Sequence, residues 1–226
     1  MKIGIIAAMK PEFEMLYEKL ENASDIKLVG TRFYEGNIGN AEVVLCECGV
    51  GKVNSAIAAT VMINEFECSL LINTGIAGGV KLNTRDVVIA SSLAYHDFDT
   101  TIFGYAYGQV PAMPKEFIPS IDSVVMVKSI LKRLNIDYVC CPVYSGDQFV
   151  SSLAQLDKID MKTPCACEME GASIAQVAVK AGVDFIVLRY ISDCVGEENQ
   201  VNDYLTFERA MAERSANICL QILNNL

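Results

Sequence analysis

The segment spanning residues 168–193 limits the possible folds more than any other part of the chain. Its centre is an apolar helical pattern that ends at Gly182, a residue that easily adopts the positive φ of a helix C-terminus. Residues 185–188 (FIVL) then form a short, continuous apolar run of the kind found in buried strands. Strand, helix and strand in this order predict a crossover unit with two parallel strands, which is typical of α/β proteins.

Acidic residues stand at the end of each strand of this unit. Glu168 and Glu170 close the first strand on one face, with Met169 on the other, and Asp193 closes the second strand. Open α/β sheets bind ligands at the carboxyl ends of parallel strands, so we expect these acids to share one crevice. The spacing leaves a second explanation equally open, in which they only cap a helix or form a turn.

Composition predicts one globular domain over residues 1–226. The chain is 52% hydrophobic and 20% charged, which is enough apolar material for a sizeable core. Its net charge is −10 and its 18 basic residues form no cluster, so a nucleic-acid-binding surface is not expected. Nine scattered cysteines and a single histidine do not match a zinc site, and we expect no metal and reduced, structural thiols.

The N-terminal residues do not predict export or membrane insertion. Residues 1–9 are apolar, but Pro11 and two glutamates follow at once, whereas a signal peptide has a longer apolar region and a cleavage site. No apolar run reaches the ~18 residues of a membrane-spanning helix. The sequence therefore predicts a cytoplasmic protein that does not interact with membranes.

The remaining pattern alternates strands and helices along the chain. Pro11 suits the first turn of a helix, and Glu12 would then lie just past the first strand, beside the other acids. Glycines in residues 74–79 predict a turn at the end of a strand, where a backbone can approach a ligand closely. The expected strands are residues 2–8, 33–38, 42–48, 69–73, 86–92 and 137–145, together with the run 185–188 that leads into residues 189–193. Helices are expected from Pro11, after Lys52, over residues 121–134, after Glu170 and over residues 203–224.

Two further stretches are distinctive. Residues 49–52 (GVGK) resemble a phosphate loop, but Cys46 and Val53 stand where a Walker motif needs glycine and a hydroxyl residue. Residues 103–111 form an aromatic, glycine-rich loop that should not stay exposed, so it is expected to cover a pocket or a subunit interface. His96 is interpreted as a structural residue, because no nucleophile or metal cluster surrounds it in the sequence.

With these pieces in place, the chain resembles the 5′-methylthioadenosine/S-adenosylhomocysteine nucleosidases of the purine nucleoside phosphorylase/nucleosidase superfamily. The resemblance covers nearly the whole length and depends on the order and spacing of residues 2–12, 48–53, 72–79, 95–97, 103–109, 145–147, 168–170 and 191–193. It implies an α/β fold, a three-layer α/β/α sandwich with a mixed, partly barrel-like central sheet. It also implies a homodimer, no cofactor, and hydrolysis of the bond between adenine and ribose.

The resemblance also implies a role for each site residue. Asp193 looks like the acid that protonates adenine N7, Ser192 like its hydrogen-bonded helper, and Glu12 like the carboxylate that activates water. Glu170 resembles the residue that binds the ribose hydroxyls, with Met169 packed near the sugar.

Further positions of the motif follow in the same way. Glu168 and Arg189 match a supporting shell, Phe149 resembles the ring that stacks on adenine, and Val150 supplies backbone hydrogen bonds to the base. The sugar and its 5′ substituent would be lined by Met9, Val50, Ile76 and Tyr204, of which Ile76 contributes its backbone and Tyr204 stands where phenylalanine is expected. A neighbouring subunit would contribute Ile102, Phe103, Tyr105 and Pro111.

Three alternatives remain open at this stage. Nucleoside phosphorylases that resemble this chain carry arginine near the position of Asn73 and a Gly-Asp-Pro-type loop where this chain has residues 9–12, and the carboxylate of Glu12 would repel phosphate. A futalosine-type nucleoside hydrolase would use the same acids with a different 5′ pocket. A nucleoside-binding protein without catalysis would be free to lose Glu12, Glu170 or Asp193, and all three are present.

Overall fold

The computed structural model describes residues 1–159, 161 and 163–226. Its strands are β1 (Lys2–Ala7), β2 (Glu21–Leu28), β3 (Thr31–Ile38), β4 (Ala41–Glu47), β5 (Leu70–Val80), β6 (Val87–Tyr95), β7 (Val139–Ser145), β8 (Cys165–Glu168) and β9 (Asp184–Cys194). Its α-helices are α1 (Lys10–Tyr17), α2 (Lys52–Asn64), α3 (Ile121–Arg133), α4 (Gly171–Ala181) and α5 (Gln200–Leu223). Two 3-10 helices, η1 (Thr101–Phe103) and η2 (Leu153–Leu156), lie in the connections.

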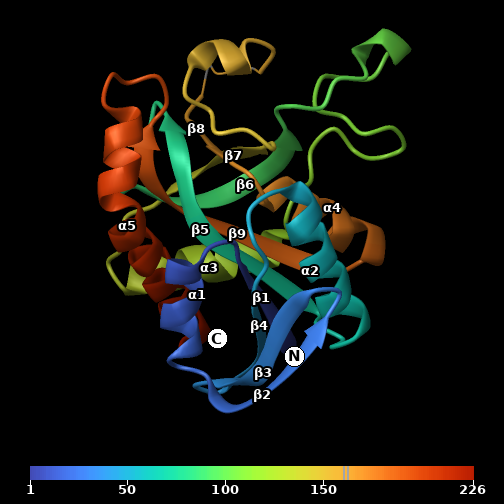
Figure 1. The fold of residues 1–226 in the computed structure, drawn as a ribbon, viewed down its shortest axis with the longest axis vertical. Coiled ribbons are helices and arrows are strands. Elements are labelled where there is room, and N and C mark those ends of the chain that lie inside the picture. Colours follow the sequence, from blue (N-terminus) through green and yellow to red (C-terminus); the bar gives the residue numbers. More distant parts are fainter. Residues whose placement is uncertain (160, 162) are drawn as a thin grey trace.

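The strands form one mixed sheet that closes on itself at one end. The strand order is β2-β3-β4-β1-β5-β8-β7-β6-β9, and β5 also pairs with β9, so the last five strands make a closed, barrel-like ring. The strands β1, β4 and β5 are parallel, whereas β2, β3 and β4 form an antiparallel meander at the open edge. The predicted mixed, partly barrel-like sheet is therefore confirmed (Figure 1).

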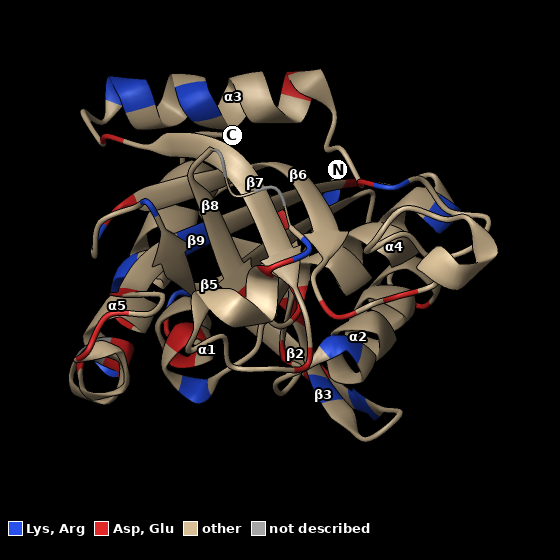
Figure 2. Cartoon of the chain, turned by 90° about the horizontal axis from the view of Figure 1, so that it is seen from above, with Lys and Arg blue, Asp and Glu red and all other residues tan. Residues whose placement is uncertain are grey.

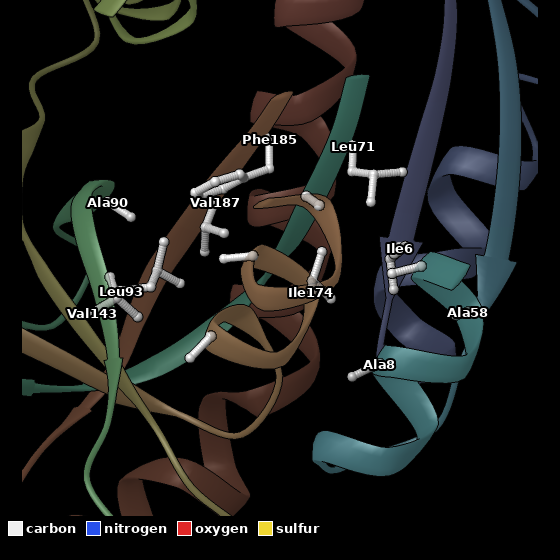
Figure 3. Close-up of a cluster of buried hydrophobic side chains, with 14 of the residues drawn as sticks. Ile6, Ala8, Ala58, Leu71, Ala90, Leu93, Val143, Ile174, Phe185 and Val187 are labelled. Atoms are coloured by element: carbon white, nitrogen blue, oxygen red, sulfur yellow. The ribbon is translucent and has the colours of Figure 1, made fainter. Parts of the chain in front are cut away.

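Helices cover both faces of this sheet, which confirms the three layers. On one face α2 and α4 pack against the sheet through small residues such as Ala58, Ala175 and Ala178. Figure 3 shows Ile174 of α4 in the same buried cluster as Leu93 and Val187 of the sheet. On the other face α1, α3 and α5 bury Leu16, Val127, Leu131, Cys219 and Ile222. Burial of apolar surface on both faces is the main force that holds the layers together.

The prediction of a crossover unit with two parallel strands in residues 168–193 is wrong. The helix α4 does connect β8 to β9, and Gly182 ends it with a φ of 70°, but the two strands do not pair with each other. Instead β5 lies between them, antiparallel to β8 and parallel to β9. Because Gly78 of β5 pairs with Cys167 on one side and Asp193 on the other, the ends of β8 and β9 still meet.

The predicted glycine turn at residues 74–79 is also wrong, because β5 continues through these residues to Val80. The glycines instead allow neighbouring groups to approach the strand closely. A Cβ atom on Gly79 would lie 2.9 Å from Cγ2 of Ile191, and one on Gly75 would lie 2.9 Å from Oε1 of Glu12. Close approach of a backbone is one of the reasons for glycine within a strand.

The strand β2 was not expected from the sequence. Its residues are mostly exposed and polar, so they show no alternation of apolar and polar side chains, and the strand exists through its backbone pairing with β3. Figure 2 shows that Lys and Arg are spread over separate elements, α3 and β3 among them. Within the described residues, no helix combines the length and the apolar character that crossing a membrane requires.

Candidate active site

One pocket collects most of the acidic residues that the sequence singled out. It encloses about 650 Å³ of space, including its open mouth, at the end of β5 where β8, β9, α1 and the start of α5 meet. Its walls are formed by Ala8, Met9, Glu12, Val50, Thr74, Gly75, Ile76, Ala77, Gly78, Gln148, Phe149, Val150, Cys167, Glu168, Met169, Glu170, Arg189, Ser192, Asp193 and Tyr204.

Glu12 is fixed by backbone donors from two elements. Its Oε2 atom accepts hydrogen bonds from the N–H groups of Ala8 and Met9, both at 3.1 Å, and its Oε1 atom accepts one from Ile76 at 3.2 Å. The first two bonds cap the start of α1, as a glutamate in the first turn of a helix can do. The side chain is only 1% exposed, and burial raises the pKa of Glu12 to about 7 despite the nearby charge of Arg189.

A buried ion pair between Arg189 and Glu168 forms the base of the pocket. The Nη2 atom of Arg189 donates to Oε2 of Glu168 and to the side-chain oxygen of Asn73, and both ionic side chains are almost fully buried. Glu168 also accepts hydrogen bonds from Ser145 Oγ and from the backbone of Gly171 at 2.8 Å. Although burial acts in the opposite direction, Arg189 and these donors hold the pKa of Glu168 below its ordinary value.

Glu170 lies at the start of α4, next to this pair. Burial and the neighbouring charge of Glu168 raise its pKa to about 7, and its Oε2 atom lies 4.0 Å from Nη2 of Arg189. Its Oε1 atom accepts a hydrogen bond of 2.9 Å from the backbone N–H of Gly51. Gly51 has a φ of 103°, which glycine adopts readily, so the chain at residues 49–52 can bring a backbone donor to this carboxylate.

Asp193 is held by two side chains. Ser192 Oγ donates to its Oδ1 atom at 2.5 Å, and Nε2 of Gln200 donates to its Oδ2 atom at 2.7 Å. The hydroxyl of Ser192 also lies 3.3 Å from the carbonyl oxygen of Ala77 in β5. Asp193 is only 1% exposed and lines the same pocket as Glu12 and Glu170.

An apolar wall faces these acids. The rings of Phe149 and Tyr204 meet edge to face with their centroids 5.3 Å apart, and the hydroxyl of Tyr204 lies 3.9 Å from the sulfur of Met9. Phe149 is 43% exposed at the pocket mouth, so one ring face is accessible to a bound molecule. A planar aromatic ligand could stack there while its polar edge faces the acids.

The structure does not bring the aromatic loop to this pocket within one chain. Ile102 and Phe103 lie in η1 and are 86% and 77% exposed, Tyr105 is 36% exposed, and Pro111 is also exposed. This segment projects from the body of the molecule in Figure 1. Tyr107 anchors its base through a hydrogen bond of 2.7 Å to the carbonyl oxygen of His96.

Sequence reasoning missed several residues of the site. Asn73 and Ser145 bind the Arg189–Glu168 pair, and Gln200 binds Asp193. None of them belongs to a motif of charged residues, so only their position at a strand end or at a helix start could have drawn attention to them. The side chain of Asn73 also donates to the carbonyl oxygen of Ile6 at 3.0 Å, which ties β5 to β1.

The described residues offer no arrangement of three or more His, Cys, Asp or Glu side chains suited to a metal ion. His96 is buried, burial lowers its pKa, and Nε2 of its ring has no hydrogen-bond partner among the residues that the structure describes.

Comparisons with known proteins agree on one group of relatives. The family model described as the phosphorylase superfamily matches residues 2–224. A protein of Desulfotalea psychrophila named 5′-methylthioadenosine/S-adenosylhomocysteine nucleosidase is 39% identical, over 100% of this chain and 98% of its own length.

Similar solved structures include an S-adenosylhomocysteine nucleosidase and a futalosine hydrolase. The S-adenosylhomocysteine nucleosidase of Streptococcus pyogenes, in complex with 5-methylthiotubericidin, has a TM-score of 0.93 at 38% identity and covers 100% of this chain and 97% of its own. The futalosine hydrolase of Helicobacter pylori has a TM-score of 0.92 at 31% identity and covers 100% of this chain and 98% of its own.

Replacing Arg189 by methionine should destabilise the protein strongly. The change leaves Glu168 buried without its counter-charge, and breaking a buried ion pair on one side typically costs ~3–5 kcal/mol of unfolding free energy. Adding Glu168→Gln to this variant should recover part of the loss, because glutamine can still accept the backbone hydrogen bonds. Urea denaturation of the two variants and the parent measures both effects.

The matched control is Arg209→Met in α5, which removes an exposed pair with Glu213 and should leave the unfolding midpoint nearly unchanged. A parent-like stability of Arg189→Met would show that the ion pair does not hold the base of the pocket together.

Proposed function

Because this chain belongs to the phosphorylase superfamily and, within it, to the 5′-methylthioadenosine/S-adenosylhomocysteine nucleosidases, we propose how its pocket breaks the bond between adenine and ribose. The chain is a nucleoside hydrolase of N-glycosidic bonds. The observation that carries the assignment of roles is the pocket in which Glu12, Glu170 and Asp193 lie together below an exposed aromatic ring.

Asp193 is the general acid in this proposal. Adenine is a poor leaving group until it is protonated, so a proton donor near N7 lowers the barrier to bond cleavage. Asp193 lines the pocket beside Val150, whose backbone can bind the edge of the base, while Phe149 can stack on its face. Ser192 holds the carboxyl group of Asp193 in a fixed orientation through the bond to Oδ1.

Glu12 is the general base that orients and deprotonates the attacking water. Its pKa of about 7 suits a group that must accept a proton near neutral pH. Its three backbone hydrogen bonds fix the carboxylate on the floor of the pocket, at the side formed by α1 and β5. A water held there can attack the sugar as the bond to adenine stretches and positive charge develops on the ribose.

Glu170 accepts hydrogen bonds from the ribose hydroxyl groups, and Met169 packs near the sugar. Glu168 and Arg189 support these residues from below, since Glu168 binds the backbone N–H of Glu170 at 3.0 Å. The 5′ substituent lies along Met9, Val50, Ile76 and Tyr204, all of which line the pocket. No step in this scheme uses a cofactor or a metal ion.

The arrangement of charges favours water over phosphate as the second substrate. Among the described residues that line the pocket, Arg189 is the only cation, and it is already bound to Glu168 and Asn73. A bound phosphate would need free cationic donors. It would also meet Glu12, a carboxylate at the place where the water is proposed to bind.

The exposed aromatic loop supports a homodimer. Ile102 and Phe103 expose large apolar side chains, which monomeric proteins rarely leave uncovered as a group. We propose that this loop, with Tyr105 and Pro111, reaches a second copy of the chain and completes the 5′ end of that copy's pocket.

A futalosine-type substrate is the second candidate. The futalosine hydrolase of Helicobacter pylori shares this fold closely, and Tyr204 places a hydroxyl group in the apolar wall of the pocket. Such a group can bind a polar 5′ substituent as well as pack against a thioether.

Adenine release from methylthioadenosine, followed by chromatography with and without phosphate, tests the proposed reaction. We expect adenine and free methylthioribose at the same rate in both conditions. Release that requires phosphate and gives a sugar 1-phosphate would make the protein a phosphorylase. No release from methylthioadenosine, together with hydrolysis of a futalosine-type nucleoside, would favour the second candidate.

Replacing Asp193 by asparagine should lower kcat by ~10²–10⁴-fold, because a positioned general acid typically contributes that factor. Asparagine keeps the size of the side chain, so the unfolding transition should remain cooperative. The matched control is Asp203→Asn in the first turn of α5, where activity should stay close to that of the parent. Full activity of the Asp193→Asn variant would remove Asp193 from its proposed role.

The dependence of activity on pH should show an acidic limb near neutrality. The pKa values of Glu12 and Glu170 are both raised to about 7, so each carboxylate gains a proton as the pH falls through this value. Because the base must be ionised, kcat/KM should fall about tenfold per pH unit below that range, with an apparent pKa that belongs to both groups.

Steady-state kinetics from pH 5 to pH 9 measures this limb. Glu12→Gln should lose activity across the whole range, whereas Glu14→Gln, on the same helix, should keep the profile of the parent. An acid limb centred at the ordinary pKa of a glutamate would contradict the effect of burial on these groups.

A further inference from the structure

Gln200 is the first residue of α5 and a buried polar side chain, bonded to Asp193, that the proposed mechanism does not use. It is 3% exposed and makes three hydrogen bonds. Its Nε2 atom donates to Oδ2 of Asp193 at 2.7 Å and to the carbonyl oxygen of Val150 at 2.8 Å, and its Oε1 atom accepts from the N–H of Gly196 at 2.9 Å. Gln200 does not itself line the pocket, so it holds these groups from behind.

The orientation of this side-chain amide is determined by its partners. A backbone N–H can only donate and a backbone carbonyl can only accept, so the oxygen of the amide must face Gly196 and the nitrogen must face Val150. A flipped amide would leave both backbone groups facing the wrong atom in a buried environment, which is costly. Consequently the nitrogen always presents a donor to Oδ2 of Asp193.

The three bonds connect the acid to the segment that binds the base. Asp193 is the proposed proton donor to adenine, and Val150 supplies the proposed backbone contacts to the same ring. One amide nitrogen bonds to both groups, so it fixes how far apart they lie and how they face each other. Ser192 constrains the other oxygen of Asp193, and together the two residues leave the carboxyl group one orientation.

We propose that Gln200 is a positioning residue for catalysis, which sets Asp193 relative to the adenine-binding backbone through its donor nitrogen. This inference rests on the proposed function, because it assigns Gln200 to the acid of that reaction. Tyr204, one turn further along α5, lines the pocket on the same side of the helix, so the start of α5 serves both the acid and the apolar wall.

Gln200→Glu provides the sharpest test. Glutamate has nearly the same shape and can still accept from Gly196, but it offers an oxygen to Val150 and Asp193 where glutamine offers a donor. We expect kcat for methylthioadenosine hydrolysis to fall at least tenfold, with a smaller change in KM, as for the loss of one buried, charge-assisted hydrogen bond. Gln200→Ala should show a similar loss, and Gln200→Asn, which keeps the amide, should lose less than Gln200→Glu.

The control is Asn202→Ala, an exposed position in the same turn of α5, which should keep the kinetics of the parent. Thermal unfolding of each variant separates a general loss of structure from a specific loss of kcat. A Gln200→Glu variant with the kcat of the parent would overturn the inference, since a residue that only fills space tolerates this change.

A second result would also overturn it. If Gln200→Ala bound adenine more tightly and kept its kcat, as measured by calorimetry and steady-state kinetics, Gln200 would compete with the base instead of positioning the acid. The parent protein separates this failure from that of the proposed function. If the parent releases adenine from no nucleoside, the proposed function itself is wrong. If the parent is active and the Gln200→Glu variant is equally active, only the proposed role of Gln200 is wrong.

Discussion

The buried ion pair between Arg189 and Glu168 is the interaction on which the rest of the site depends. Burying a single charge in a protein core is very costly, and an ion pair is tolerated only when further hydrogen bonds satisfy both partners. Here the backbone of Leu188 and the side chain of Asn73 bind Nη1 and Nη2 of the guanidinium group, and Ser145 and Gly171 bind the carboxylate, while Nε of Arg189 has no partner among the described residues. The pair therefore joins β5, β7, β9 and the start of α4 at one point below the pocket.

This pair also divides the carboxylates of the pocket into two kinds. Glu168 takes the direct contact with Arg189, and its pKa is lowered as a result. Glu12 and Glu170 are buried at a greater distance from that charge, and burial raises their pKa values to about 7. Because Arg189 makes its close contact with Glu168, Glu12 and Glu170 can exchange protons near neutral pH. A base in this pocket requires this property.

The sequence predicted the elements and the acids better than it predicted how the strands pair. Pro11, Gly182 and the apolar runs located most helices and strands, because these signals are local. The closing of β5 against both β8 and β9 could not be predicted, since it depends on contacts between residues far apart in the chain. The same holds for the contacts of Asn73 and Gln200, which are neutral and acquire their importance only from the charged groups placed beside them.

The two proposed catalytic carboxyl groups, the base Glu12 and the acid Asp193, are held in different ways, and this difference has a consequence for variation. Glu12 is bound entirely by backbone N–H groups from the connection between β1 and α1 and from β5, so substitutions of neighbouring side chains leave its support in place. Asp193 is bound by the side chains of Ser192 and Gln200, and Gln200 in turn depends on Gly196, whose φ of 83° favours glycine. The position of Asp193 is therefore more sensitive to substitution than that of Glu12. Substitutions in the segment between β9 and α5 should lower activity by displacing the carboxyl group of Asp193.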